Sequence, residues 1–358
     1  MKVIQLLTTL KYGDAVGNDV IALDGVIKKM GFETCIYADE IGNRIPKNMA
    51  KLSKYIPKLK EDDVIIYHMA IASDLTYLFA KSKAKKVLIY HNVTPAIFFD
   101  RYDKNAAKAC NDGLEQVKFL SDKVDYCLAD SEYNKQQLLD MNYKCPINVL
   151  PILIPFEDYE KTPSENIISK YKNDGYTNII FTGRIAPNKK QEDIILAFDA
   201  YQKLYNKKSR LIIIGSGGDR DIYYRLLKKY VSELGNDNVI FTGHISFDEI
   251  LAYYSLADIF LCMSEHEGFC IPLVEAMKFE IPVIAYDSSA ISETGGNAVF
   301  LLEKKDPVET AGVIDYIINN PHISEQLVRN GKKRVDFFAT DKIENMFVNY
   351  MNEIIQKG

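Results

Sequence analysis

Short runs of apolar, mostly β-branched residues recur along the chain, and segments long enough to hold a helix separate them. Runs of this kind are typical of strands in a parallel sheet covered by helices, because both faces of each strand are then buried. The pattern therefore predicts an α/β fold with two doubly wound parallel sheets. The expected strands are Val3–Leu7, Thr34–Tyr37, Val64–Tyr67, Val87–Tyr90, Tyr126–Ala129 and Ile147–Leu150 in the first half, and Ile179–Thr182, Leu211–Ile214, Val239–Thr242, Ile259–Cys262, Val283–Tyr286 and Ala298–Phe300 in the second.

The length of the chain agrees with two domains, since 358 residues is about twice what one compact domain usually holds. Prolines interrupt strand pairing, so the stretch Pro151–Pro155 is the best boundary. We expect one domain over residues 1–155 and a second over residues 156–341. Apolar residues at helical spacing over Lys342–Ile355 predict a terminal amphipathic helix.

Composition excludes several classes of protein. A hydrophobic fraction of 47% supplies a core and excludes disorder, and a net charge of −5 argues against nucleic acid as the main partner. The six cysteines include no C-x-x-C pair and no zinc-binding spacing, so we interpret them as small apolar residues in a reducing compartment. We find no signal peptide or membrane-spanning stretch in the sequence, and we expect a cytoplasmic protein.

Glycine turns follow several of the expected strands. Gly13 and Gly17 lie before a helix pattern, where backbone amides can approach a ligand, but their spacing is not a nicotinamide-binding fingerprint. A plain strand-to-helix turn is an equal alternative. In the second half, Arg184 and Lys189 follow a strand and Gly183, and two fixed cations there suit a diphosphate. The alternative is a solvated basic turn.

A third glycine turn begins at Gly215 and leads into Asp219-Arg220-Asp221. A D-x-D sequence can hold a metal-bound nucleotide, but these acidic residues directly precede an expected helix. We interpret them as helix-capping residues and expect no metal site.

The most informative stretch is Ser264–Met277, which leads from an expected strand through a glycine turn into a helix that begins near Pro272. Glu267 then lies in the loop and Glu275 in the helix. Amides of the turn would face an anion, while the two carboxylates accept hydrogen bonds from hydroxyl groups. Together these groups predict a nucleotide-sugar site. The alternative is that Glu265 and Glu267 are only acidic residues favoured near a helix N-terminus.

The order of these motifs resembles that of a known family. Arg184 with Lys189, the Gly215 turn, the stretch Thr242–Ile245, and glutamates at Glu267 and Glu275 occur in the order seen in retaining glycosyltransferases of the GT-B fold. The chain is similar to the family-four, or group 1, members of that class. The resemblance is strong over residues 179–303, and the first half is similar mainly in the order of its elements.

The resemblance implies a set of roles. Arg184 and Lys189 would hold the donor diphosphate, Glu275 would bind the ribose hydroxyls, and Glu267 with the amides of Gly268, Phe269 and Cys270 would contact the donor sugar. The nucleobase would lie near His244 and Ile245, Gly215 would belong to the donor site, Gly13 and Gly17 would close over the phosphates, and His91 would contact the sugar beside the reacting carbon. His91, Glu267, Arg184 and Lys189 form the expected catalytic set. The family often has glycine at the position of Cys270.

The resemblance also implies two Rossmann-like domains, an acceptor-side domain over residues 1–155 joined by the terminal helix 342–358, and a donor domain over residues 156–341. The expected reaction transfers a sugar from a UDP- or GDP-sugar to a glycan, lipid-linked or small-molecule acceptor with retention, as in bacterial surface glycan synthesis, without a metal or another cofactor. His68 is a weaker candidate on the acceptor side. A nucleotide-sugar epimerase or hydrolase and a non-catalytic partner subunit stay open as alternatives, and a nicotinamide dehydrogenase ranks below both.

One basic segment of the first half bears on the membrane. Residues Lys47–Lys60 hold five lysines and no acidic residue, with apolar residues near helical spacing. Such a face would give weak peripheral contact with the inner face of an anionic membrane. The alternative is a solvated helix over the first sheet.

Overall fold

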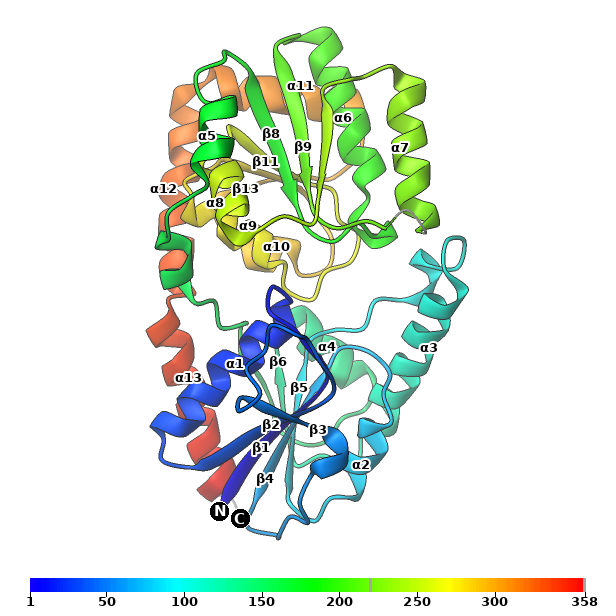
Figure 1. Cartoon of the computed structure of the whole chain (residues 1–358), viewed down its shortest axis with the longest axis vertical. Coiled ribbons are helices and arrows are strands. Elements are labelled where there is room, and N and C mark those ends of the chain that lie inside the picture. The colour runs from blue at the N-terminus through cyan, green and yellow to red at the C-terminus, as the bar shows by residue number, and fades with distance from the viewer. Residues whose placement is uncertain (219–220, 357–358) are drawn as a thin grey trace. The chain divides into compact units, whose positions relative to one another are not determined.

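The computed structural model describes residues 1–218 and 221–356, and the chain divides into two compact units (Figure 1). The first unit comprises Met1–Ile97, Asn105–Pro155 and the C-terminal segment that begins at Phe338. The second comprises Phe98–Lys104 and Phe156–Phe337. Nothing in the sequence pattern predicts that the short segment Phe98–Lys104 belongs with the second unit.

The first unit contains a parallel sheet in the order β3-β2-β1-β4-β5-β6-β7. Its strands are β1 (Lys2–Leu10), β2 (Glu33–Ile41), β3 (Ala50–Leu52), β4 (Val64–Met69), β5 (Lys85–Tyr90), β6 (Tyr126–Ala129) and β7 (Ile147–Val149). The helices of this part are α1 (Ala15–Lys29), α2 (Leu75–Lys81), α3 (Lys104–Phe119), α4 (Glu132–Asp140) and α13 (Thr340–Gln356).

The second unit contains a parallel sheet in the order β10-β9-β8-β11-β12-β13. Its strands are β8 (Thr177–Thr182), β9 (Ser209–Ile214), β10 (Val239–Gly243), β11 (Ile259–Cys262), β12 (Val283–Tyr286) and β13 (Val299–Leu302). Its helices are α5 (Glu165–Tyr171), α6 (Gln191–Leu204), α7 (Ile222–Leu234), α8 (Phe247–Ser255), α9 (Ile271–Lys278), α10 (Ile291–Gly295), α11 (Pro307–Asn319) and α12 (Pro321–Phe337).

The terminal helix α13 is part of the core of the first unit. Its residues Ile343, Phe347, Met351 and Ile354 are buried and pack in one cluster with Val3 of β1 and other strand residues. Burying each such side chain contributes about 1.5–3 kcal/mol. The predicted amphipathic helix is therefore present, and its apolar face is what attaches it to this unit.

The predicted doubly wound α/β architecture is confirmed. All twelve expected strands coincide with or overlap observed strands, and helices lie between most successive strands as expected (Figure 1). The sheets put the carboxyl ends of neighbouring parallel strands at one edge, which is where open α/β sheets bind ligands.

The prediction of a helix over Lys47–Lys60 is wrong. Residues Ala50–Leu52 form β3, which pairs with β2 in parallel, and a short 3-10 turn follows at Ser53–Tyr55. Ala50 and Leu59 are buried while Tyr55 is 62% exposed, so the apolar residues of the segment do not share one helical face. Pairing along β2 has outweighed an approximate helical spacing. None of the described helices combines the length and apolar character needed to cross a membrane.

Candidate functional site

Two loops of the second unit are joined at the carboxyl edge of its sheet. Strands β8 and β11 are parallel neighbours, so the loops that follow them leave from the same edge. The Glu265 N–H donates to the Asn188 carbonyl at 2.8 Å, and the Asn188 side-chain amide donates to the His266 carbonyl at 3.0 Å. These two hydrogen bonds bring the Lys189 turn and the Glu267 loop together, although 78 residues separate them.

Lys189 and Glu267 form a buried ion pair at this junction. The Lys189 ammonium lies 2.6 Å and 2.5 Å from the two carboxylate oxygens, and the Glu267 side chain is 8% exposed. Burial alone lowers the pKa of Lys189, but the adjacent Glu267 carboxylate outweighs it and leaves this pKa raised. An ammonium has three N–H donors, so one can still bind a phosphate oxygen while Glu267 accepts the others.

Arg184, the second expected cation, has an exposed side chain and no ion pair with any described residue. Its backbone carbonyl accepts a hydrogen bond from Gln191 at the start of α6, which fixes the turn. Nearby, a β-carbon on Gly215 would lie 1.9 Å from the Gly183 carbonyl oxygen. Glycine at position 215 is therefore required for the loops after β8 and β9 to approach.

Glu275 lies in α9 as predicted, and two tyrosines hold its carboxylate. The Tyr159 hydroxyl donates to one oxygen at 2.5 Å and the Tyr254 hydroxyl to the other at 2.6 Å. Burial raises the pKa of Glu275, and the two hydroxyl bonds partly oppose it. Each carboxylate oxygen has a second lone pair for a ribose hydroxyl. Sequence reasoning missed both tyrosines, because nothing in their spacing marks them as partners of Glu275.

The turn between Glu267 and α9 has an unusual backbone. Cys270 precedes the helix with φ of 74°, in the left-handed region that favours glycine, and its side chain does not cap α9. The Glu267 N–H donates to the Ser289 hydroxyl, and the Phe269 carbonyl accepts from Thr294. These bonds to the α10 region fix the loop, with Gly268 half-buried between them.

The remaining residues expected at this edge lie after β9 and β10. His244 is exposed and Ile245 is half-buried just after β10, whose last residue Gly243 forms an antiparallel bridge with Gly215. Of the D-x-D sequence, Asp219 and Arg220 lie outside the described residues. Asp221 caps α7, with its carboxylate accepting from the amides of Tyr223 and Tyr224, as predicted.

The glycine turn of the first unit is structurally constrained. Gly13 has φ of 81°, and a β-carbon on Gly17 would lie 2.5 Å from the Lys11 carbonyl oxygen. Gly17 lies in the first turn of α1, not in the loop before the helix as expected, and its N–H donates to Asp14, which caps α1. This amide is thus already engaged by a carboxylate, whereas the resemblance expects the turn to close over phosphates.

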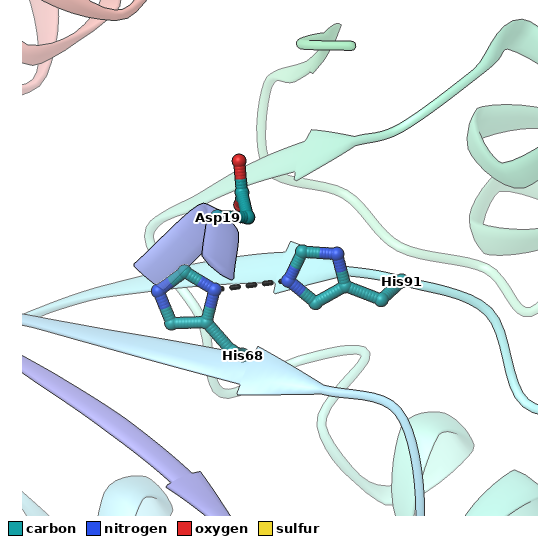
Figure 2. Close-up of side chains that lie close together, drawn as sticks. All are labelled: Asp19, His68 and His91. Carbon is teal, nitrogen blue, oxygen red and sulfur yellow. Dashed lines mark hydrogen bonds between the residues drawn. The ribbon is translucent and has the colours of Figure 1, made fainter. Parts of the chain in front are cut away.

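A chain of buried hydrogen bonds in the first unit contains His91. His68 lies in β4 and His91 directly follows β5, and Figure 2 shows their rings joined beside Asp19. The His68 Nδ1 and His91 Nε2 atoms are 2.9 Å apart, and the chain continues from His68 to Gln5 and from His91 to Asp130, at 3.0 Å each. All of these side chains are buried.

The donor and acceptor of each hydrogen bond between Gln5, His68 and His91 can be assigned. The Gln5 amide nitrogen donates to the Val20 carbonyl, so its oxygen faces His68 and the His68 Nε2 carries a proton. Burial lowers the pKa of His68, which is therefore neutral and accepts at Nδ1. It follows that His91 Nε2 carries a proton, and the pKa of His91 is raised because Asp130 outweighs the effect of burial.

Asp19 and the two histidines have the ligand types of a metal site. Their candidate ligand atoms lie within 4.8 Å of one another. Two nitrogens on one tetrahedral zinc ion would lie about 3.3 Å apart, given bonds of about 2.0–2.1 Å. The observed 2.9 Å is the distance of a direct N–H···N hydrogen bond. With both ring nitrogens engaged, His91 can bind a sugar through its ring only by giving up one partner.

Comparisons with known proteins give a consistent result. The family described as glycosyl transferases group 1 matches residues 164–334. The capsular polysaccharide biosynthesis glycosyltransferase CapM of Staphylococcus aureus is 27% identical over 259 residues, which cover 66% of each chain. The alpha-monoglucosyldiacylglycerol synthase of Acholeplasma laidlawii is 25% identical over 365 residues, which cover 92% of this chain and 88% of the relative.

The fold is also found among solved structures. HepE of Anabaena, in complex with UDP and glucose, matches with a TM-score of 0.76 and 16% identity over 99% of this chain and 100% of that chain. At this identity the likeness establishes the fold alone.

Proposed function

Because this chain belongs to the group 1 family of retaining, nucleotide-sugar-dependent glycosyltransferases with the GT-B fold, we propose that the second unit binds a nucleoside-diphosphate sugar. The observation that carries the proposal is the junction of the Lys189 and Glu267 loops at the edge of a parallel sheet, where a cation and a hydroxyl acceptor meet. UDP and GDP are the proposed nucleotides.

The proposed donor site assigns one function to each group. Arg184 and Lys189 bind the diphosphate, and Glu275 binds the ribose, with Tyr159 and Tyr254 fixing its carboxylate. Glu267 and the turn Gly268–Cys270 contact the sugar, and the base lies beside His244 and Ile245. For His91, Gly13 and Gly17 we keep the donor contacts that the resemblance implies.

The chemistry follows from where charge develops. When the bond between the anomeric carbon and the diphosphate breaks, negative charge grows on the leaving phosphate, and fixed cations stabilise it most in a site that excludes water. The acceptor oxygen forms the new bond on the same face of the sugar, and its proton passes to the leaving phosphate oxygen. Arg184 and Lys189 supply the cations for this step.

We propose a hydroxyl of a surface glycan or glycolipid precursor as the acceptor. The two curated relatives support this class, since their names place them in capsule and glycolipid synthesis. The exposed lysines of the β3 region, together with Leu52 and Tyr55, offer a basic surface for an acceptor held at an anionic membrane.

The test is product analysis with UDP- and GDP-sugars and with glycan or lipid-linked acceptors, in buffer containing EDTA. We expect transfer with retention, seen in the anomeric proton coupling of the product, and activity that persists in EDTA. Release of free sugar with every acceptor, or an epimerised donor, would contradict the proposal.

A further inference from the structure

Two cysteine thiols and one carboxylate converge beneath the predicted donor loop. Cys262 is the last residue of β11, Glu267 lies in the following loop, and Cys270 immediately precedes α9. The two sulfurs and a carboxylate oxygen all lie within 4.8 Å of one another, and all three residues are buried. No pair spacing in the sequence predicts this cluster, because seven residues separate the cysteines and the turn folds them back together.

Cys270 has a backbone conformation that points to a role for the cluster. A φ of 74° is a conformation that residues with a β-carbon rarely adopt, and strained residues of this kind gather at functional sites. Here the strained position directs a thiol toward Cys262 and Glu267 in a loop that Ser289 and Thr294 hold rigid. The ligand side chains are therefore held in place before any ion arrives.

We propose that Cys262, Glu267 and Cys270 bind a thiophilic divalent cation of the Zn²⁺ class, and that this ion blocks the donor site. The blocking part rests on the proposed function, while the binding part does not. Zinc takes thiolate sulfurs at about 2.3 Å and carboxylate oxygens at about 2.0–2.2 Å in tetrahedral sites. Its ligand atoms then lie about 3.5–3.8 Å apart, so the cluster needs little contraction to hold the ion.

Charge balance supports an ion at this place. When the ion binds, the two thiols each release a proton to solvent and become thiolates. Two thiolates and the Glu267 carboxylate carry three negative charges, and a divalent cation with the Lys189 ammonium carries three positive ones. The buried site is neutral before and after the exchange, so no uncompensated charge is left in the interior.

The ion would compete with the donor for the same carboxylate. Both Glu267 oxygens already accept from Lys189, so a metal would take a lone pair that is otherwise left for the sugar hydroxyl we assign to this group. Hard cations are expected to behave differently, because Mg²⁺ prefers an all-oxygen shell and keeps its waters. We therefore expect soft divalent ions to inhibit donor binding through this site and Mg²⁺ to have no effect on it.

The experiment titrates Co²⁺, which absorbs visibly when bound to thiolates, into the full chain after chelation and reduction with a phosphine, and then displaces it with Zn²⁺. We expect one ion per chain with a thiolate-to-cobalt band in wild type, and binding at least about tenfold weaker in Cys262→Ala and in Cys270→Gly. Cys145→Ala is the matched control, because Cys145 and Cys127 form a second thiol pair, 3.5 Å apart, in the first unit.

The outcomes separate the two parts of the proposal. A band that is absent in wild type, or that forms with wild-type affinity in both Cys262→Ala and Cys270→Gly, overturns the site. If the site binds Co²⁺, Zn²⁺ should raise the apparent KM for the donor, and Cys262→Ala should be insensitive relative to its own rate without Zn²⁺. An unchanged donor KM in the zinc-loaded wild type overturns the blocking part. The cobalt titration needs no donor, so it decides the site even if the chain transfers no sugar.

Discussion

The polar groups of the two units are organised in opposite ways. In the second unit, charged side chains lie on loops at one sheet edge, and hydrogen bonds from Glu265 and Asn188 join the loops that hold the Lys189–Glu267 pair. In the first unit, His68, His91 and Asp130 form a hydrogen-bonded chain inside the protein. Loops at a sheet edge can bring a cation and a carboxylate to where a ligand can reach them, whereas a buried hydrogen-bonded chain fixes protonation states before any ligand binds.

The largest expected effect follows from breaking the buried pair. Lys189→Ala leaves the Glu267 carboxylate buried without its cation, and losing one partner of a buried ion pair costs about 3–5 kcal/mol. We expect that loss in the free energy of unfolding, measured by urea denaturation. Lys229→Ala, which removes an exposed pair with Glu233, is the control and should change stability by less than about 1 kcal/mol. Similar small losses in both variants would contradict the importance of the Lys189 pair.

The next effect concerns Asp19, which lies beside the hydrogen-bonded His68 and His91 of the first unit (Figure 2). Burial raises the pKa of Asp19 from 3.8 to about 7, so the folded state favours its protonated form. The contribution of this group to the free energy of unfolding is fully present below pH 3.8 and is lost as the pH rises through 7. Asp19→Asn, which mimics the protonated form, should therefore match wild type near pH 4 and exceed it by on the order of 4 kcal/mol at pH 8, measured by denaturation at each pH.

Asp174 provides a control for which the pH dependence of stability has the opposite sign. Its pKa is lowered by a hydrogen bond from Arg210, so its contribution is present above pH 3.8 and is lost as pH falls. Asp174→Asn should lose stability relative to wild type at neutral pH and approach it in acid. An Asp19→Asn variant that is no more stable than wild type at pH 8 would show that His91 compensates the Asp19 charge.

A smaller effect separates the two glutamates of the proposed donor site. Glu275→Gln should weaken binding of the free nucleotide by about 10- to 100-fold, because a charged hydrogen-bond acceptor contributes about 1.5–3 kcal/mol. Glu267→Gln should lower sugar transfer while nucleotide affinity persists. Calorimetry with the nucleoside diphosphate and kinetics with the full donor measure the two quantities. Equal losses of nucleotide affinity in both variants would contradict the assignment.

The smallest expected effect concerns the basic segment of the first unit. Each lysine near an anionic surface contributes about 1 kcal/mol, so flotation with anionic liposomes should be weak and reversed by salt. Lys51→Glu with Lys54→Glu should abolish it, because both side chains are exposed. Wild-type protein that stays unbound at low salt would favour an acceptor in solution.

The sequence predicts the order of strands and helices more fully than it predicts which distant segments and side chains contact one another. Apolar strands such as Leu211–Ile214 are recognisable because burial on both faces leaves a continuous run. The three-residue strand β3 is too short to leave such a pattern, and its lysines point instead to a solvated helix. Pairing with β2, which depends on a distant segment, decides its structure.

The residues of the candidate site also differ in how far the sequence predicts them. Glu267 and Glu275 belong to one continuous motif, so their places in a loop and a helix follow from local signals. The Tyr159 and Tyr254 hydroxyls reach Glu275 from elements 116 and 21 residues away, and no local signal specifies such partners. Cys262 and Cys270 are likewise brought together by a left-handed turn at Cys270 that the residue type does not suggest.

The most direct test of the proposed donor site is calorimetric titration of the nucleoside diphosphate into wild type and into a Lys189→Met, Glu267→Gln double variant. The double substitution removes both buried charges together, which avoids the cost of an unpaired ion and preserves the fold. We predict that wild type binds one equivalent and that the double variant binds at least about 100-fold more weakly, a change of about 2.7 kcal/mol. Equal affinity in a folded double variant would contradict the assignment of these loops as the donor site.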